Sequence, residues 1–168
     1  MKYYYLTGDV NAVNVNSVIA PMLDQIHTAP QEPAYLYISS TGGDIDSAIR
    51  LYDFIKSSNL TITTVGFGQI DSAAIIVFLA GSQRILIKNC RLRLHPPIYH
   101  GPQSQILLVH QEALSLFQAL DKRYFEIISN ETLKSEAKIK KMYTNGKILS
   151  PREALTMKLA TEIKEKLP

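Results

Sequence analysis

Residues 65–80 read VGFGQIDSAAIIVFLA, which predicts a strand end, a glycine turn and a buried helix in succession. Gly66 and Gly68 lie in the predicted turn, and Ser72 opens a wholly apolar run. A serine at a helix N-terminus lies beside N–H groups without intrahelical acceptors, where a developing oxyanion is stabilised. Asp71 or Ser72 could also be an N-cap and nothing more, since both residue types cap helices well.

Strand and helix patterns alternate around this stretch. The predicted strands are 3–6, 34–38, 60–65, 84–87 and 91–94. With the amphipathic helices between the first of them, they predict an α/β fold of repeated β-α-β units, whose ligand sites lie beyond the carboxyl ends of the strands. Gly42, Gly43, Ser72 and His95 each follow a predicted strand, so we expect them to converge at one edge of the sheet.

His95 is the histidine best placed to act as a base. Pro96 and Pro97 follow it, and a residue before proline favours an extended backbone, which would fix the orientation of the imidazole. A purely structural histidine is the alternative. Among the other histidines only His100, in the next loop, could lie near the same cleft.

The C-terminal part contains a helix that is too long for one small core. Its apolar stripe runs over 103–129, with further apolar residues beside it. Such surplus apolar surface predicts packing against another subunit, and crowding inside a large domain is the alternative. A basic helix at 134–142, a capping box at Ser150 and Glu153, and a short edge strand or tail at 160–166 complete the chain.

Composition and charge exclude several classes of function. The 168 residues include 18 basic and 15 acidic ones, and no aromatic residues interleave with a basic stripe, so nucleic acid is not an expected partner. Cys90 is the only cysteine, which excludes an internal disulfide and favours a small buried side chain. The first residues do not form a signal peptide, and the longest apolar run, 73–80, is too short to span a bilayer. We expect a cytoplasmic protein without membrane contact, metal or other cofactor.

Five stretches together resemble one known family. They are YYLTG at 4–8, LYISSTGG at 36–43, GQIDS at 68–72, LHPP at 94–97 and ILSPREA at 148–154. Their order and spacing are similar to F-L-T-G, L-Y-I-N-S-P-G-G, G-Q-A-A-S, M-I-H-Q-P and F-L-S-A-x-E-A of the proteolytic subunit of the Clp protease, a serine peptidase of the ClpP/crotonase fold. The resemblance implies a single domain over 1–168, with a head at about 1–102 and 131–168 and a protruding handle helix at about 103–130.

The resemblance also implies a mechanism and an assembly. Ser72 would be the nucleophile and His95 the general base, and the N–H groups of Gly43 and Ala73 would form the oxyanion hole. The substrate would be an unfolded polypeptide or short peptide, bound in extended form beside a strand edge. Homo-oligomeric, stacked rings are implied by the handle. The resemblance begins at Tyr3, so we expect the family's N-terminal axial segment to be absent, which speaks against docking of an unfoldase chaperone.

The chain departs from the family pattern at several positions. Thr41, Ala74 and Pro96 replace a proline, a glycine and a glutamine, but none of these changes removes a reacting group. Alignment of 148–150 places Met142 where the family has the aspartate that orients the histidine, and 137–152 contains no Asp or Glu.

The third member of the triad is therefore open. Asn145, a backbone carbonyl, Glu136 and Asp71 are the alternatives for orienting His95. A catalytically weak or inactive scaffold subunit is the main alternative function. An acyl-CoA enzyme of the crotonase type, which would use the same N–H donors, and a Ser-Lys peptidase are less favoured.

Overall fold

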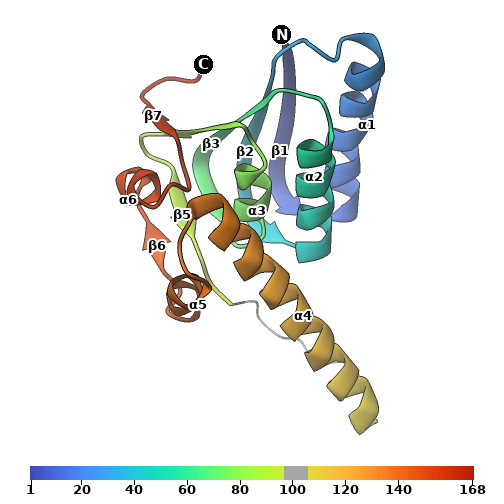
Figure 1. Cartoon of the computed structure of the whole chain (residues 1–168), viewed down its shortest axis with the longest axis vertical. Coiled ribbons are helices and arrows are strands. Elements are labelled where there is room, and N and C mark those ends of the chain that lie inside the picture. Colours follow the sequence, from blue (N-terminus) through green and yellow to red (C-terminus); the bar gives the residue numbers. More distant parts are fainter. Residues whose placement is uncertain (97–105) are drawn as a thin grey trace.

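The computed structural model of the chain describes residues 1–96 and 106–168 (Figure 1). Its strands are β1 (Lys2–Val10), β2 (Ala34–Gly43), β3 (Ile62–Asp71), β4 (Gln83–Ile87), β5 (Arg91–Arg93), β6 (Ile148–Leu149) and β7 (Glu162–Lys164). Its helices are α1 (Ala12–Thr28), α2 (Ile45–Ser57), α3 (Ala74–Leu79), α4 (Leu107–Thr132), α5 (Glu136–Thr144) and α6 (Pro151–Thr156). The predicted α/β fold with a long helix is confirmed; residues 103–105 of that predicted helix, and His100, lie outside the described residues.

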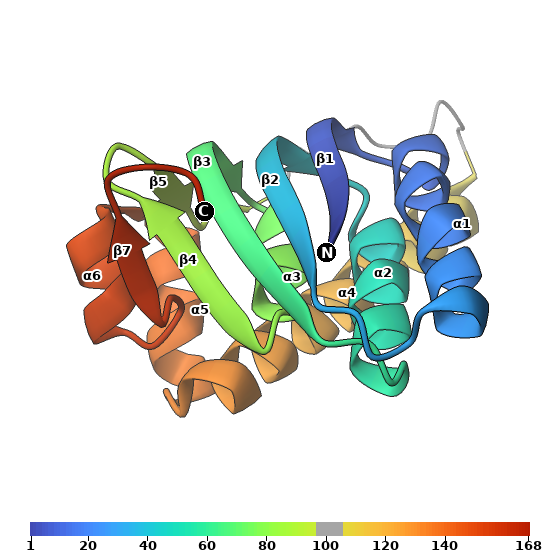
Figure 2. The same cartoon turned by 90° about the horizontal axis from the view of Figure 1, so that it is seen from above.

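The sheet brings the ends of several strands to one edge. β1, β2, β3, β4 and β7 pair in parallel in that order (Figure 2), β5 pairs in parallel with the end of β3, and β6 runs antiparallel to β5. Helices α1, α2 and α3 cover one face of the sheet and enclose the main core. Because the carboxyl ends of parallel strands point the same way, the ends of β2, β3 and β5 lie near one another. This edge is the one at which the sequence predicts the site.

β3 differs from its prediction in length and shape. The strand was expected to end at Val65 before a turn, yet it continues to Asp71. Its pairing register with β2 is irregular: Ile38 pairs with Gly66, whereas Ser40, two residues later on β2, pairs with Ile70, four residues later on β3. Gly68 adopts a φ of 66°, which glycine reaches without strain. The glycine turn was therefore a wrong interpretation: the glycines shape an irregularity inside a strand.

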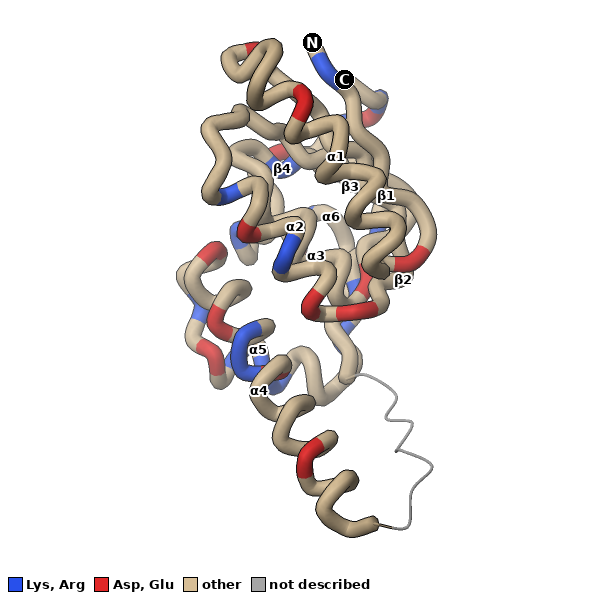
Figure 3. The backbone as a smooth tube through the Cα atoms, turned by 90° about the vertical axis from the view of Figure 1, so that its right-hand side faces the viewer, with Lys and Arg blue, Asp and Glu red and all other residues tan. Residues whose placement is uncertain are grey.

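Helix α4 is buried only at its C-terminal half. Tyr124, Phe125, Ile128 and Thr132 lie in the core, whereas Leu107 and Leu108 are 71% and 72% exposed. The helix projects away from the body, and Figure 3 shows that its far half is almost free of charged residues. This exposed half carries the surplus apolar surface from which packing against another subunit is predicted.

An ionic cluster ties the base of α4 to the head. The Glu131 carboxylate accepts hydrogen bonds from the Tyr52 hydroxyl at 2.7 Å and from Arg84 Nη1 at 2.8 Å, and it pairs with Lys56 at 2.8 Å. These neighbours hold the pKa of Glu131 below its usual value despite partial burial. The long helix is thus anchored to the head near its C-terminal end.

The C-terminal elements follow the sequence prediction closely. The Ser150 side chain and Glu153 form the predicted capping box at the start of α6, and β7 is a short strand at the edge of the sheet. Cys90 is buried, and burial raises the pKa of its thiol to about 12, as expected for a small core residue rather than a reactive thiol.

Candidate active site

Ser72 occupies a strained turn between β3 and α3. Its φ is 54°, in the left-handed region that non-glycine residues rarely adopt. The Ser72 N–H donates to the carbonyl oxygen of Arg93 at 2.8 Å, and the Tyr124 hydroxyl donates to the Ser72 carbonyl at 3.3 Å. A strained backbone of this kind persists only where its surroundings hold it, and it often marks a functional site.

The N-cap interpretation of this turn is wrong for both residues. Ala73 occupies the N-cap position of α3, and no side chain caps this helix. The Asp71 carboxylate instead accepts a hydrogen bond from Arg91. Ser72 therefore precedes the helix by two residues and is free of the capping role that would otherwise explain it.

The end of β2 lies directly against the serine turn. Gly42 has a φ of 91°, and a Cβ atom added there would lie 2.6 Å from the Asp71 carbonyl oxygen and 2.7 Å from Ser72 Cβ. Gly43 has a φ of 143°, and its added Cβ would lie 2.3 Å from the Val10 carbonyl oxygen. Only glycine fits these two positions, so the close approach of β2 to Ser72 depends on both.

A free backbone donor lies beside Ser72. Ala73 is fully buried, and its N–H has no hydrogen-bond acceptor among residues 1–96 and 106–168. Buried N–H groups are rarely left unpaired, except in the first turn of a helix where a ligand or water can complete them. The Ala73 N–H is thus available to an oxyanion formed at Ser72.

His95 follows β5, the strand that pairs with the end of β3. It is partly exposed, and its Nδ1 lies 2.8 Å from the carbonyl oxygen of Pro96. Because a carbonyl oxygen can only accept, Nδ1 carries the proton and Nε2 is left with the lone pair that a base requires. Within the part of the chain that the structure describes, no hydrogen bond joins His95 to Ser72; such bonds are often long in the absence of substrate.

The segment before β6, which continues the pairing with β5, has a glycine at the position expected opposite His95. Arg93 pairs with Ile148 across β5 and β6, and the Leu94 N–H donates to the Lys147 carbonyl at 2.9 Å. Continuing this register brings Gly146 opposite His95. Gly146 has a φ of 61°, and a Cβ added to it would meet nothing within 4 Å.

None of the side chains considered for orienting His95 forms a hydrogen bond with it within the described residues. Met142 packs against the core and lines a separate pocket with Met157. Asn145 is exposed, and the Asp71 carboxylate pairs with Arg91 at 2.8 Å. Among the described carboxylates none hydrogen-bonds to His95, so the backbone carbonyl of Pro96 is the acceptor that the structure places at Nδ1.

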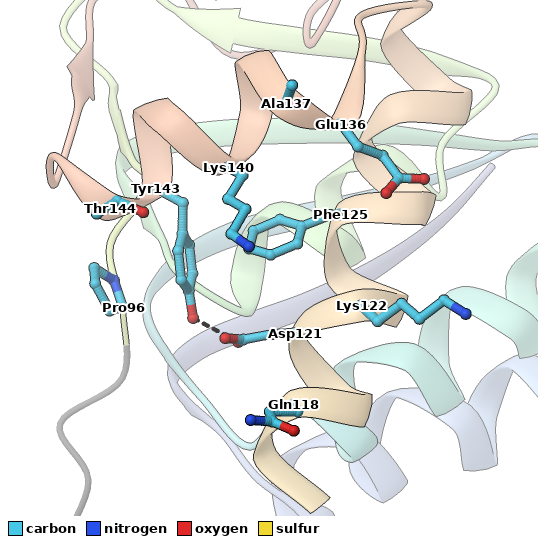
Figure 4. A pocket seen from close by; sticks show the side chains of 10 residues that line it. All are labelled: Pro96, Gln118, Asp121, Lys122, Phe125, Glu136, Ala137, Lys140, Tyr143 and Thr144. Atoms are coloured by element: carbon cyan, nitrogen blue, oxygen red, sulfur yellow. Dashed lines mark hydrogen bonds between the residues drawn. The ribbon is translucent and has the colours of Figure 1, made fainter. Parts of the chain in front are cut away.

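A pocket of about 760 Å³ opens beside Pro96, between α4 and α5 (Figure 4). Phe125 and Tyr143 form apolar walls, and the Tyr143 hydroxyl donates to Asp121 at 2.7 Å. Burial, then the hydrogen bond to Asp121, raises the pKa of Tyr143 well above its usual value, so the hydroxyl stays a neutral donor. Lys122, Glu136 and Lys140 add charged groups to the lining.

The sequence did not point to Asp121, Tyr143 or Arg91. Asp121 lies within an apolar helical stripe and Tyr143 within a basic helix. The two side chains form a hydrogen bond only because α4 packs against α5. Arg91 reads as an ordinary strand residue until β5 pairs with β3. No local motif marks any of them.

The described residues contain neither a metal-ligand cluster nor a membrane-spanning helix. No group of three or more His, Cys, Asp or Glu in 1–96 and 106–168 could hold a metal ion. None of the helices within these ranges combines the length and the apolar character needed to cross a membrane.

Known proteins are similar to this chain in sequence and in fold. A family model described as Clp protease matches residues 2–166. The ATP-dependent Clp protease proteolytic subunit 1 of Rhodococcus jostii (strain RHA1) is 30% identical over 155 residues, which cover 91% of this chain and 70% of that protein. A solved structure of a ClpP1 mutant from Listeria monocytogenes has a TM-score of 0.82 at 25% identity, covering 98% of this chain and 91% of that chain. The expected ClpP-like fold is confirmed.

Proposed function

Since the chain belongs to the Clp protease family, we propose that it is a serine peptidase subunit in which Ser72 and His95 cleave peptide bonds. The observation that carries the proposal is the strained Ser72 turn, with the unpaired Ala73 N–H on one side and Gly42 packed against the other. A serine held in this way is suited to attack and to stabilise the resulting oxyanion.

The mechanism follows from the groups at the strand ends. His95 Nε2 takes the proton from Ser72 Oγ as the oxygen attacks the carbonyl carbon, and the imidazolium then protonates the leaving amine. The N–H groups of Ala73 and Gly43 stabilise the oxyanion. Water, activated by His95 in the same way, hydrolyses the acyl-enzyme.

The incomplete triad limits the rate. A neutral Pro96 carbonyl stabilises an imidazolium less than a carboxylate does, because a charge-assisted hydrogen bond is about twice as strong. In a serine protease with a full triad, loss of the acid lowers kcat by about 10⁴ while a weaker Ser-His activity remains. We therefore expect slow hydrolysis.

Substrate and assembly follow from the surfaces around the site. An unfolded or short peptide would lie in extended form along the end of β2, with one side chain in the pocket between α4 and α5. The exposed apolar half of α4 would pack against another copy in a ring-shaped cytoplasmic homo-oligomer. The family assignment gives no support to the acyl-CoA alternative.

A serine-reactive fluorophosphonate probe tests the proposal. The wild-type protein and Ser17→Ala, which removes a hydroxyl on α1, should be labelled, whereas Ser72→Ala should not. His95→Ala should slow labelling strongly, because the general base is lost. Absence of labelling and of peptide hydrolysis in assembled, folded wild-type protein would refute the proposal.

A catalytically weak scaffold subunit is the second candidate function. It is favoured by one observation: within the described residues no carboxylate contacts His95. In that case the probe would label Ser72 slowly, and peptide turnover would stay at the background seen with Ser72→Ala. A turnover well above that background would exclude this candidate.

A further inference from the structure

Arg91 joins the strand that ends at Ser72 to the strand that leads to His95. From β5, its Nη1 donates to Asp71 Oδ1 at 2.8 Å and its Nη2 donates to Gln69 Oε1 at 2.7 Å, both on β3. The two strands pair over only three residues, Gln69–Asp71 against Arg91–Arg93. The two side-chain hydrogen bonds thus reinforce a short ladder directly before the site.

The burial of the two ionic partners is unequal. The Asp71 side chain is 6% exposed and that of Arg91 is 41% exposed. A buried carboxylate without a partner is strongly unfavourable. In the described part of the chain Arg91 is the only cation paired with Asp71. The arginine therefore compensates a buried charge that directly precedes the nucleophile.

That charge matters for chemistry at Ser72. A carboxylate one residue from the serine would oppose the negative charge that develops on the substrate oxygen, and this opposition is strong where water is excluded. The family pattern quoted above has alanine at the position of Asp71, so this chain carries a carboxylate that the pattern lacks. An ion pair at this place removes the conflict.

We propose that Arg91 is a positioning residue for the reaction that acts through Asp71: its guanidinium neutralises the buried carboxylate directly before Ser72. This inference rests on the proposed peptidase function. Its core claim is that Arg91 is needed because Asp71 is charged.

A double-substitution series tests that claim. Arg91→Met should lower kcat for a short peptide and the rate of fluorophosphonate labelling by about tenfold to a hundredfold, with KM nearly unchanged, since the transition state and not the bound substrate is opposed. Asp71→Asn should stay within about threefold of wild type, because an amide still accepts from Arg91. Asp71→Asn combined with Arg91→Met should recover most of the lost rate.

Two further variants keep the test decisive. Arg91→Lys loses the second hydrogen bond, to Gln69, but keeps a positive charge beside Asp71, so labelling is expected to stay within about threefold of wild type even if Arg91→Met folds poorly. Arg152→Met removes an exposed arginine on α6 and is the control for loss of one positive charge. A circular-dichroism melt of each variant separates loss of fold from loss of rate.

The outcomes separate the two proposals. If wild type and Arg91→Met are labelled equally fast while Ser72→Ala is not labelled, the peptidase function stands and the role of Arg91 is overturned. If the double variant is as slow as Arg91→Met, or Arg91→Lys as slow as Arg91→Met, neutralisation of Asp71 is not the cause and the inference is overturned. If wild type itself is not labelled, both proposals fail.

Discussion

The two halves of the candidate site are held in different ways. Ser72 is bound through its backbone on both sides, by Arg93 and Tyr124, and Gly42 packs against it. His95 is partly exposed, and its hydrogen bond within the described residues goes to the carbonyl of Pro96, the next residue in the chain.

This difference indicates that His95 is less constrained than Ser72. A strained turn is maintained only by many surrounding contacts, so the Ser72 half is pre-organised and intolerant of change. The hydrogen bond from His95 to the neighbouring Pro96 carbonyl fixes the imidazole tautomer but does not tie His95 to a distant part of the chain. A stronger hydrogen-bond acceptor for His95 should therefore raise activity. A side chain added beside Ser72 should therefore lower activity, whereas a carboxylate added beside His95 should raise it.

The largest effect is expected on the Ser72 half, from Gly42→Ala. The new Cβ would collide with backbone atoms of the serine turn, and the φ of 91° disfavours any side chain. We expect the free energy of unfolding to fall by about 2–5 kcal/mol and labelling of Ser72 to be lost. Urea titration with the fluorophosphonate assay measures both.

Gly8→Ala is the matched control for Gly42→Ala. Gly8 also has a positive φ, of 81°, but a Cβ added there meets nothing within 4 Å. It should lose only about 1 kcal/mol, the cost of the strained backbone. Equal losses from both substitutions would show that the close approach of β2 to Ser72 is unimportant.

The second largest effect is a gain, from Gly146→Asp on the His95 half. A carboxylate opposite His95 could replace the Pro96 carbonyl as the acceptor of Nδ1–H, and aspartate tolerates the φ of 61° better than most residues. Peptide turnover should rise by about tenfold or more, because the imidazolium is stabilised.

Gly8→Asp, which adds the same charge at another open glycine, should leave turnover unchanged. If the Gly146→Asp protein folds but hydrolyses peptide no faster than wild type, the inference that residue 146 lies opposite His95, which extends the β5–β6 register, is contradicted.

A smaller effect is expected from Tyr124→Phe, which removes the hydrogen bond from α4 to the Ser72 carbonyl. At 3.3 Å this bond is long, so the loss of stability should be about 0.5–1.5 kcal/mol and labelling should slow by less than about threefold. Thermal melts with Tyr3→Phe as the control measure the difference. A tenfold loss of labelling would mean that α4, rather than the strand ends, holds the serine.

The smallest effect concerns the pH dependence of stability and the Glu153 carboxylate in the capping box of α6. Hydrogen bonds from the Ser150 backbone, then from Lys147 and the Ser150 hydroxyl, hold the pKa of Glu153 at about 2, below the usual 4.5. Because the folded protein favours the ionised form, this contribution is complete above pH 4.5 and is lost as pH falls towards 2. Glu153→Gln should flatten the dependence of Tm on pH in that window.

Glu126→Gln, which removes one carboxylate that pairs within α4, is the control for the change in charge. An unaltered acid limb in Glu153→Gln would show that the capping box does not contribute to the pH dependence of stability.

Local patterns were enough for most of the elements. The apolar run after Ser72 and the capping box at Ser150 predict helices because spacing and capping chemistry act over a few residues. The end of β3 was missed for the opposite reason: Gly66 and Gly68 read as a turn locally, while pairing with β2 and β5 keeps the strand going to Asp71.

The α/β class and the family follow from the sequence alone, which also predicts that Gly43, Ser72 and His95 lie at one edge of the sheet, because parallel strands present their carboxyl ends together. The surroundings of these residues depend on the tertiary structure. The pairing of Asp71 with Arg91 depends on a contact between segments that are distant in the sequence, and the hydrogen bond from His95 to the Pro96 carbonyl depends on side-chain orientation. Short-range sequence patterns encode neither.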